Sequence, residues 1–227
     1  MFRFLGFLRQ FCADALLMGV THLPGPSGYA VRRWYWRGRL RHLGQGALID
    51  TGVHFRNPGF IHVGENAWID KGAVILAGSD ASPREKIAVA NPAFEGQPGV
   101  VHIGANVHVG IGCIVSGIDA GVFIADDCGL AARVQVYAFT HHYRSKAEPS
   151  KAVHFGPMAA HERQCLVVGP VQIGENTGVA TNALILAGSF IPRNCFVGAG
   201  SVVMPGRHAE NSVLAGDPAR RVRDRFA

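Results

Sequence analysis

VQIGENTGVATNALILAGSFIPRNCFVGAGSVVMPG, residues 171–206, is the stretch of sequence that decides the fold. An aliphatic residue returns at every sixth position, namely at Ile173, Val179, Ile185, Ile191, Val197 and Val203. An amphipathic helix needs apolar residues three and four positions apart, and a half-buried strand needs them two apart. A period of six fits neither pattern and is typical of a repeat protein whose short flat faces each take one hexad.

The same period runs through the earlier part of the chain, with aliphatic anchors at Val63, Ile69, Ile75, Ile103, Val109, Ile124 and Leu130. Three residues after almost every anchor stands Asn, Gly or Asp, which accept the positive φ of a tight turn; Arg133 is the exception. The next position is small or β-branched in every hexad except the last, which has Arg207. We therefore predict an all-β prism of parallel strands. Three hexads close one coil, about five to six coils are present, and the coils stack about 4.8 Å apart.

Two segments interrupt the period, at residues 80–100 and 140–165. Both are polar and contain proline, so we expect them to leave the prism as excursion loops. Loops of this length in a compact repeat protein are usually functional.

The chain ends differ in character from the prism, which we expect to span residues 46–206, and we treat residues 1–45 and 207–227 separately. Residues 1–23 are apolar and predict a helical segment, but Arg9 and Asp14 interrupt any run that could span a bilayer. One interpretation is packing on the body or on a neighbouring subunit. The other is peripheral membrane contact through residues 1–45, in which residues 28–44 mix aromatics with arginines.

The composition limits the kinds of partner that the protein could bind. The net charge of +6 favours anionic ligands. The arginines, however, gather at the two ends of the chain and no nucleic-acid motif is present, so we expect no nucleic-acid partner. Three of the five cysteines, Cys113, Cys128 and Cys195, occupy the small-residue position of the repeat. Such cysteines are expected to be reduced, which predicts a cytoplasmic location, with the inner face of the membrane as its variant.

The run from residue 171 to 223 resembles the C-terminal half of hexapeptide-repeat acyltransferases, which are left-handed parallel β-helices. It is most similar to the bacterial sugar O-acetyltransferases of lipopolysaccharide and capsule synthesis. GAGSVV at 198–203 and AGDPARRVR at 215–223 carry the resemblance, which extends over roughly residues 45–223. It implies a homotrimer, an acetyl-CoA co-substrate bound in a groove between two subunits, and a histidine base on an excursion loop.

The resemblance also assigns residues. FTHHY at 139–143 matches the family's histidine-bearing segment, which makes His141 the first candidate for the base and His142 the second. Ala199 and Ser201 match positions that line the pantetheine. The residues expected near the adenosine phosphates are Pro218, Ala219, Arg220 and Arg221.

The chain departs from the family pattern at two places. The family usually has a tryptophan where this chain has Gly178, which implies a larger space beside the donor or acceptor. Asp217 replaces an asparagine, and because Asp is a good N-cap and Pro218 a natural first helical residue, we predict a short C-terminal helix.

Histidines elsewhere raise the question of a metal, because some β-helix enzymes hold zinc through three of them. His102 and His108 lie one hexad apart and could face the same side, but the zinc pattern of those enzymes is missing. We therefore predict no metal site. We interpret His54, His62, His102 and His108 as outward-facing residues of the prism.

Acyl transfer needs a base for the acceptor, donors for the oxyanion, and alignment of the two substrates. The resemblance implies transfer of an acetyl group from acetyl-CoA to a sugar hydroxyl of a surface-glycan precursor, with a histidine base. Two alternatives stay open: N-acetylation of an amino-sugar nucleotide, and a non-catalytic β-helix scaffold.

Overall fold

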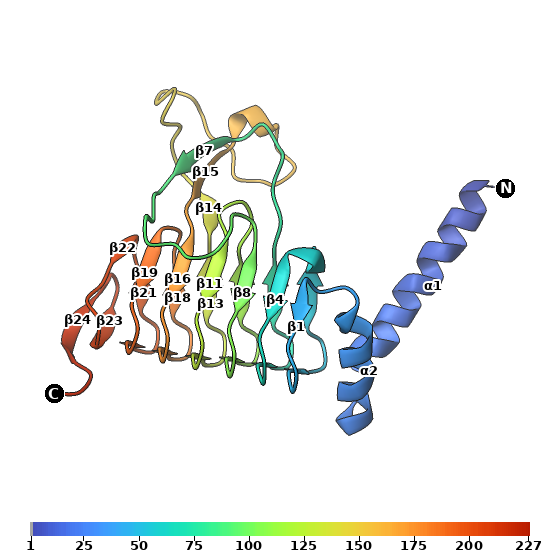
Figure 1. Cartoon of the computed structure of the whole chain (residues 1–227). Helices are drawn as coiled ribbons and strands as arrows, with labels where there is room; N and C mark the ends of the chain where they lie inside the picture. Colours follow the sequence, from blue (N-terminus) through green and yellow to red (C-terminus); the bar gives the residue numbers. More distant parts are fainter. Residues whose placement is uncertain (1) are drawn as a thin grey trace.

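The structure, a computed structural model, describes residues 2–227, with side chains from residue 6 onward. A prism of short parallel strands forms the body, two helices stand at its N-terminal end, and a hairpin closes its C-terminal end (Figure 1). Six complete coils and part of a seventh stack along the axis. The predicted parallel β-helix is therefore confirmed.

Each coil contributes one strand to each of three sheets. Sheet A contains β1 (His42–Leu43), β4 (Ile61–Val63), β8 (Val101–Ile103), β11 (Val122–Ile124), β16 (Val171–Ile173), β19 (Ser189–Ile191) and β22 (Gly206–Arg207). Sheet B contains β2 (Leu48–Ile49), β5 (Trp68–Ile69), β9 (His108–Val109), β12 (Gly129–Leu130), β17 (Gly178–Val179), β20 (Phe196–Val197), β23 (Ser212–Gly216) and β24 (Ala219–Asp224). Sheet C contains β3 (His54–Arg56), β6 (Val74–Leu76), β10 (Ile114–Ser116), β13 (Gln135–Tyr137), β18 (Leu184–Ile185) and β21 (Val202–Val203).

The hexad anchors form the core. In sheet A, Ile103 pairs with Ile124, and Ile124 pairs with Ile173 in the next coil, so identical positions stack in register along the axis. All three side chains are fully buried. Because every coil fills the same narrow interior, each face must supply an aliphatic side chain at the same place, and this requirement produces the period.

The corners follow the predicted chemistry. Asn66, Asn106 and Asn176 adopt positive φ, and so does Arg133, which occupies the same turn position without the usual residue type. Neighbouring coils approach so closely that a Cβ added to Gly64 would lie 2.4 Å from the backbone of the following coil. The cysteines at the small-residue position, Cys113, Cys128 and Cys195, are buried and free.

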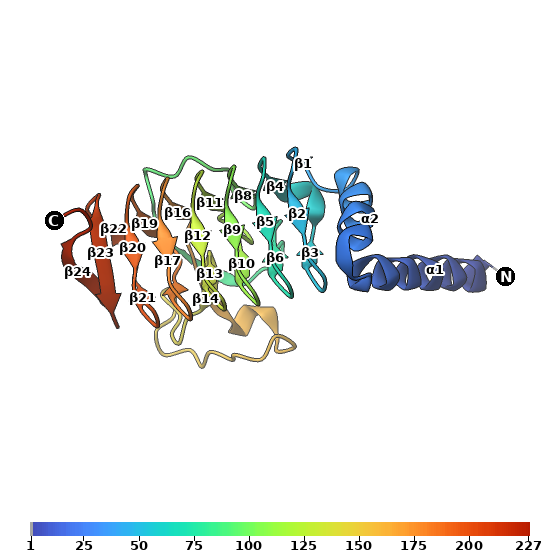
Figure 2. The same cartoon turned by 90° about the horizontal axis from the view of Figure 1, so that it is seen from below.

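The N-terminal segment forms α1 (Phe2–His22) and α2 (Gly25–Arg37). Helix α2 covers the first coil, where the buried Trp36 ring packs edge-on against Phe55 at a centroid distance of 4.8 Å. Trp34, in contrast, is 72% exposed. Helix α1 extends away from the prism and contacts α2, leaving Phe7, Phe11 and other apolar side chains exposed (Figures 1 and 2). Within the described part of the chain, neither helix has the length and apolar content needed to cross a bilayer.

The predicted C-terminal helix is wrong. Residues 212–224 form the antiparallel hairpin β23–β24, and the Asp217–Pro218 bond at its turn is cis. Strand β23 pairs with β20 as one more rung of sheet B, and β24 covers the outer edge of β23. An uncovered edge would expose unpaired backbone N–H and C=O groups. That requirement outweighs the local helix-start signal of Asp217 and Pro218.

The two excursions leave the prism as predicted, but they are not only loops. They contain β7 (Glu85–Ala88), β14 (Phe139–His141) and β15 (Cys165–Val168), which form one small sheet, called sheet D here. Strand β15 pairs parallel with β7 and antiparallel with β14. Both excursions start after a strand of sheet C, β6 and β13, and therefore emerge at the same corner two coils apart. The short 3-10 helices η1 (Pro58–Phe60) and η2 (His161–Arg163) complete the elements.

Candidate active site

His141 is the last residue of β14 and is held by the pairing of that strand with β15, opposite Leu166. Its side chain is exposed, and the Phe155 ring from the same excursion lies 6.4 Å away at a steep angle. The base candidate is therefore presented on a paired strand above the prism rather than on a free loop.

His142 lies in a different environment. Its side chain is half-buried, and Nδ1 lies 2.6 Å from the Arg144 carbonyl oxygen. The Arg144 backbone N lies 3.3 Å from the same Nδ1, so the backbone of residue 144 holds the His142 ring in place. Because adjacent residues in a strand project to opposite sides, His141 and His142 do not face the same substrate position.

The excursion that carries these histidines is tied to the other one. The Glu85 carboxylate in β7 accepts hydrogen bonds from the backbone N–H groups of Lys146 and Ala147, at 2.7 and 3.0 Å. Hydrogen bonds from Ser145 and from these N–H groups lower the pKa of Glu85. Residues 80–100 thus support the segment that follows the candidate base.

Gly178 lies on the outer face of sheet B, beside Gly129 and Phe196 in neighbouring coils. A Cβ at Gly178 would lie 3.0 Å from the Phe196 ring, so this ring already fills part of the space that the missing tryptophan leaves. The two glycines form a flat strip between Phe196 and His108.

The structure places the two residues expected near the pantetheine in different environments. Ala199 lies in an exposed turn, whereas Ser201 is buried and its hydroxyl oxygen accepts a hydrogen bond from the Gly216 N–H. The Ser201 side chain therefore holds the C-terminal hairpin to the last coils. Its expected contact with the pantetheine stays a prediction.

Residues 218–221, expected near the adenosine phosphates, form part of the β23–β24 hairpin instead of a helix. Pro218 is exposed at the turn, and Ala219 is fully buried. Arg220 and Arg221 are both exposed, but as neighbours in β24 they project to opposite sides. Within one chain these residues do not lie next to His141. The hairpin closes the C-terminal end of the prism, whereas sheet D projects from its side (Figure 1).

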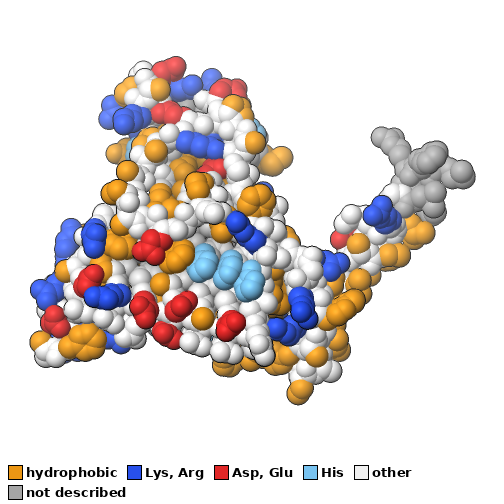
Figure 3. Space-filling model, in the orientation of Figure 1, with side chains coloured by type: hydrophobic (Ala, Val, Ile, Leu, Met, Phe, Trp, Pro, Cys, Tyr) orange, Lys and Arg blue, Asp and Glu red, His pale blue; other side chains and the backbone are white. Residues whose placement is uncertain are grey.

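Two features were not found from the sequence. The first is a column of stacked rings on sheet A, His42, His62 and His102, continued by Phe123 (Figure 3). Centroid distances are 4.5, 4.3 and 4.5 Å. Burial and the charge of His62 lower the pKa of His102 to about 4, against the opposing effect of Asp126. Three histidines at the same position of successive coils were the available signal.

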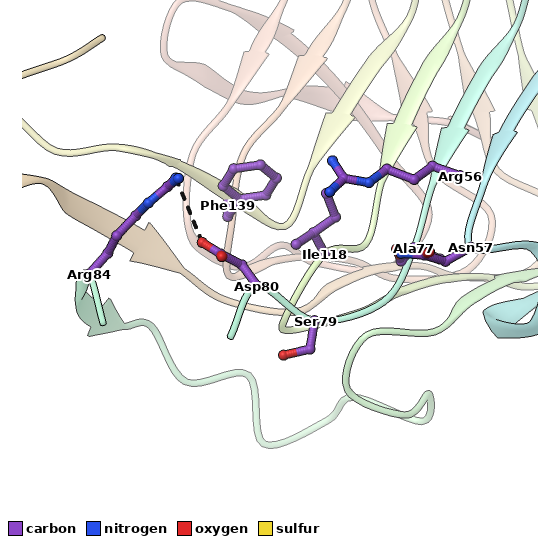
Figure 4. Close-up of a pocket in the computed structure, with 8 residues that line it drawn as sticks. All are labelled: Arg56, Asn57, Ala77, Ser79, Asp80, Arg84, Ile118 and Phe139. Carbon is purple, nitrogen blue, oxygen red and sulfur yellow. Dashed lines mark hydrogen bonds and ion pairs between the residues drawn. The ribbon is translucent and has the colours of Figure 1, made fainter. Parts of the chain in front are cut away.

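The second is a hollow lined by two arginines, Arg56 and Arg84, with Asp80 and Phe139, where sheet C meets the excursions (Figure 4). Its residues come from parts of the chain far apart in sequence, so no local motif marks it.

The expectation that His102 and His108 could face one side is wrong, because they belong to sheets A and B. His108 instead lies beside Trp68, with a ring distance of 5.1 Å, and its Nε2 is 3.4 Å from an Asp70 carboxylate oxygen. No group of three His, Cys, Asp or Glu side chains suited to a metal ion occurs among the described residues.

The hexad prism and its corner excursions define the class of fold, a left-handed parallel β-helix of hexapeptide repeats. No model of a known protein family matches the sequence. The chain is, however, 28% identical over 176 residues to WbbJ of Escherichia coli (strain K12), provisionally named an O-acetyl transferase of lipopolysaccharide biosynthesis. The match covers 78% of each chain.

Solved structures give the same fold. The chain is similar to AntD, an N-acyltransferase from Bacillus cereus in complex with dTDP and 3-hydroxybutyryl-CoA, with a TM-score of 0.67 and 18% identity over 85% of this chain and 87% of AntD. It is also similar to a maltose O-acetyltransferase from Clostridium difficile 630, with a TM-score of 0.54 and 20% identity over 95% and 85% of the two chains. The predicted resemblance to hexapeptide-repeat acyltransferases is thereby confirmed.

Proposed function

We propose that this protein transfers an acetyl group from acetyl-CoA to a hydroxyl of a sugar in a surface-glycan precursor, such as that of lipopolysaccharide or capsule. The observation that carries the proposal is an exposed histidine, His141, held at the end of a paired strand on an acyltransferase fold. The likeness to WbbJ supports the class of acceptor, and the acyl-CoA bound in the AntD structure supports the class of donor.

In the proposed reaction, neutral His141 removes the proton of the acceptor hydroxyl while its oxygen attacks the thioester carbonyl. The tetrahedral intermediate then expels the CoA sulfur, and the imidazolium returns its proton to that sulfur. The products are the acetyl ester and free CoA. His142 is the second candidate for the base, because it stands next to His141 in FTHHY at 139–143.

The donor would lie toward the C-terminal coils, between the turn at Ala199 and the exposed Pro218 at the hairpin. Arg220 or Arg221 would meet its phosphates, for which guanidinium is well suited. Because the two project to opposite sides of β24, one of them does most of this work.

We also propose a homotrimer. The outer face of sheet B exposes the apolar side chains Leu48 and Trp68 at one end and Phe196 at the other, and a neighbouring subunit would cover this face. The trimer would place the donor groove of one subunit beside the His141 strand of the next.

Helix α1 would lie along a membrane surface through its exposed apolar side chains, with turnover in the cytoplasm at the inner face of that membrane.

A second candidate is N-acylation of an amino-sugar nucleotide, which AntD in complex with dTDP-4-amino-4,6-dideoxyglucose favours. The same base would serve an amine. The third, a non-catalytic scaffold, predicts no turnover with any acceptor.

The test is acetyl-CoA turnover with a panel of neutral, acidic, phosphorylated and nucleotide-linked sugars, with free CoA measured as the product. Loss of a general base costs about 10² to 10⁴ in rate. We expect His141→Ala to lose that much kcat and His142→Ala, the matched control, to lose far less. If His142→Ala is the inactive variant, the two assignments exchange. If both keep full rate, the proposed base is wrong, and release of no CoA with any sugar would favour the scaffold.

A further inference from the structure

A hollow of about 150 Å³ lies at the corner where both excursions leave the prism. Its floor comes from the ends of sheet C strands, and its sides come from residues 80–100 and from β14 (Figure 4). The lining residues are Arg56, Asn57, Ala77, Ser79, Asp80, Arg84, Ile118 and Phe139. Two of them are arginines, and both guanidinium groups point into the hollow.

Arg56 enters from the end of β3. Its side chain is exposed and makes no hydrogen bond or ion pair with any residue between 6 and 227. Its backbone is held by parallel pairing with Leu76 of β6. A guanidinium on a rigid strand end, whose five N–H donors make no hydrogen bond to the described residues, is available to a ligand.

Arg84 enters from the opposite side, on the 80–100 excursion. Its Nη1 lies 3.6 Å from an Asp80 carboxylate oxygen, which is an ion pair but too long for a hydrogen bond. Its Nε is buried and has no acceptor among the described residues. Buried N–H donors without a partner are uncommon in folded proteins, and a bound oxygen would satisfy this one.

The charges in the hollow do not cancel. Asp80 accepts hydrogen bonds from the Ser82 N–H and hydroxyl; although burial acts the other way, these bonds and the charges of Arg84 and Lys86 lower its pKa. It is therefore one carboxylate facing two guanidinium groups. Lys86 does not add to the excess, because it is paired with Asp119 at 3.0 Å. One positive charge remains unbalanced, which favours a carboxylate or a phosphate group.

The size limits the ligand. A cavity of about 150 Å³ holds a benzene ring, so this hollow accepts one anionic group and part of a sugar ring but not a nucleotide. Phe139 and His141 are two residues apart in β14 and share one side of that strand, about 7 Å apart. That span is about the length of one pyranose ring with a substituent.

The geometry points to a subsite for the acceptor. A carboxylate or phosphate of the acceptor binds between Arg56 and Arg84, and the sugar ring extends along β14 to present its hydroxyl at His141. The acceptor is therefore an acidic or phosphorylated sugar rather than a neutral one. The position of the hydroxyl rests on the proposed function, whereas the anion site rests on the hollow alone.

Saturation-transfer NMR on the full chain tests the anion site without turnover, using glucose, glucuronate and glucose 1-phosphate as probes. Charge-assisted hydrogen bonds favour the anionic probes by on the order of 10- to 100-fold in dissociation constant. Tighter binding of glucuronate would identify the anionic group of the acceptor as a carboxylate, and tighter binding of glucose 1-phosphate would identify it as a phosphate. Arg56→Gln should remove this preference. Arg84→Lys keeps a charge beside Asp80 but lacks Nε, and should weaken it several-fold. Lys71→Gln, which removes one charge from an exposed turn, is the matched control and should change nothing.

Equal binding of all three probes, or a preference that survives Arg56→Gln, would overturn the inference. The result is separable from the proposed function. His141-dependent acetylation of neutral sugars with no anion preference would keep the enzyme and remove the subsite. Anion binding that depends on Arg56, without turnover of any sugar, would keep the subsite and remove the proposed activity.

Discussion

Acid should destabilise this protein through the histidine column of sheet A, and His102 should dominate the effect. Its ring is stacked between His62 and Phe123, and its pKa falls from 6.5 to about 4 because of burial and the charge of His62. Asp126 opposes this shift, while His42 adds to it. Arg41 and Glu95 line the hollow beside the column.

The direction of the effect follows from which state binds the proton. Below about pH 6.5 the unfolded chain protonates at this position, but the folded protein does so only near pH 4. The free energy of unfolding is therefore highest above about pH 6.5 and decreases as the pH falls toward 4. Each pKa unit corresponds to about 1.4 kcal/mol, so the free energy of unfolding should drop by on the order of 3 kcal/mol.

The perturbation that isolates this effect is His102→Phe. A phenyl ring continues the stack on Phe123 but binds no proton, so stability at about pH 7 should change by less than about 1 kcal/mol. Urea titrations at about pH 7 and about pH 4.5, above the reference pKa of most carboxyl groups, measure the free energy of unfolding. The parent should lose about 2 kcal/mol more than the variant between these values.

His54→Phe is the matched control, because His54 is exposed on sheet C and belongs to no stack of rings. It should show the same acid loss as the parent. An equal loss in His102→Phe and the parent would refute the reasoning, since the proton would then be taken up elsewhere.

Three further predictions concern the donor site, the coil spacing and the N-terminal helix. Arg220→Ala and Arg221→Ala, tested singly, should raise the KM for acetyl-CoA unequally and leave the acceptor KM unchanged; equal effects would contradict their opposite orientation. Gly64→Ala should cost about 3 kcal/mol or more in unfolding free energy, since its Cβ would meet the next coil, whereas Gly59→Ala, with nothing within 4 Å, should cost little. Deleting residues 2–22 should leave turnover of a soluble acceptor unchanged; loss of the trimer by light scattering would indicate packing, and loss of liposome binding alone would indicate membrane contact.

The coil structure was predictable because its rule is local. Each hexad carries its own anchor, turn residue and small residue, so the assignment of Ile173 or Val197 to the core needs no knowledge of distant residues. The rule also tolerates one exception. Arg133 adopts the turn φ without the preferred residue type, because the coils on either side hold its backbone in place.

The candidate site was only partly predictable. FTHHY located His141 and His142, but their different surroundings depend on the pairing of β14 with β15, which begins more than twenty residues later. The C-terminal helix was predicted wrongly from a correct local signal at Asp217 and Pro218. The open edge of the last coil decided between the two structures, and that edge exists only after the prism has formed.

By itself, then, the sequence determined the period, the residues that face the core and the corners where the chain turns, because each depends on neighbours within six positions. Only the tertiary structure decided what lies together on the outside. The histidine column joins His42, His62 and His102 across stacked coils, and the anion hollow joins Arg56 to Arg84 across a corner. Outward positions are free of the packing rule that shapes the core, so their meaning depends on which coils and excursions become neighbours in space.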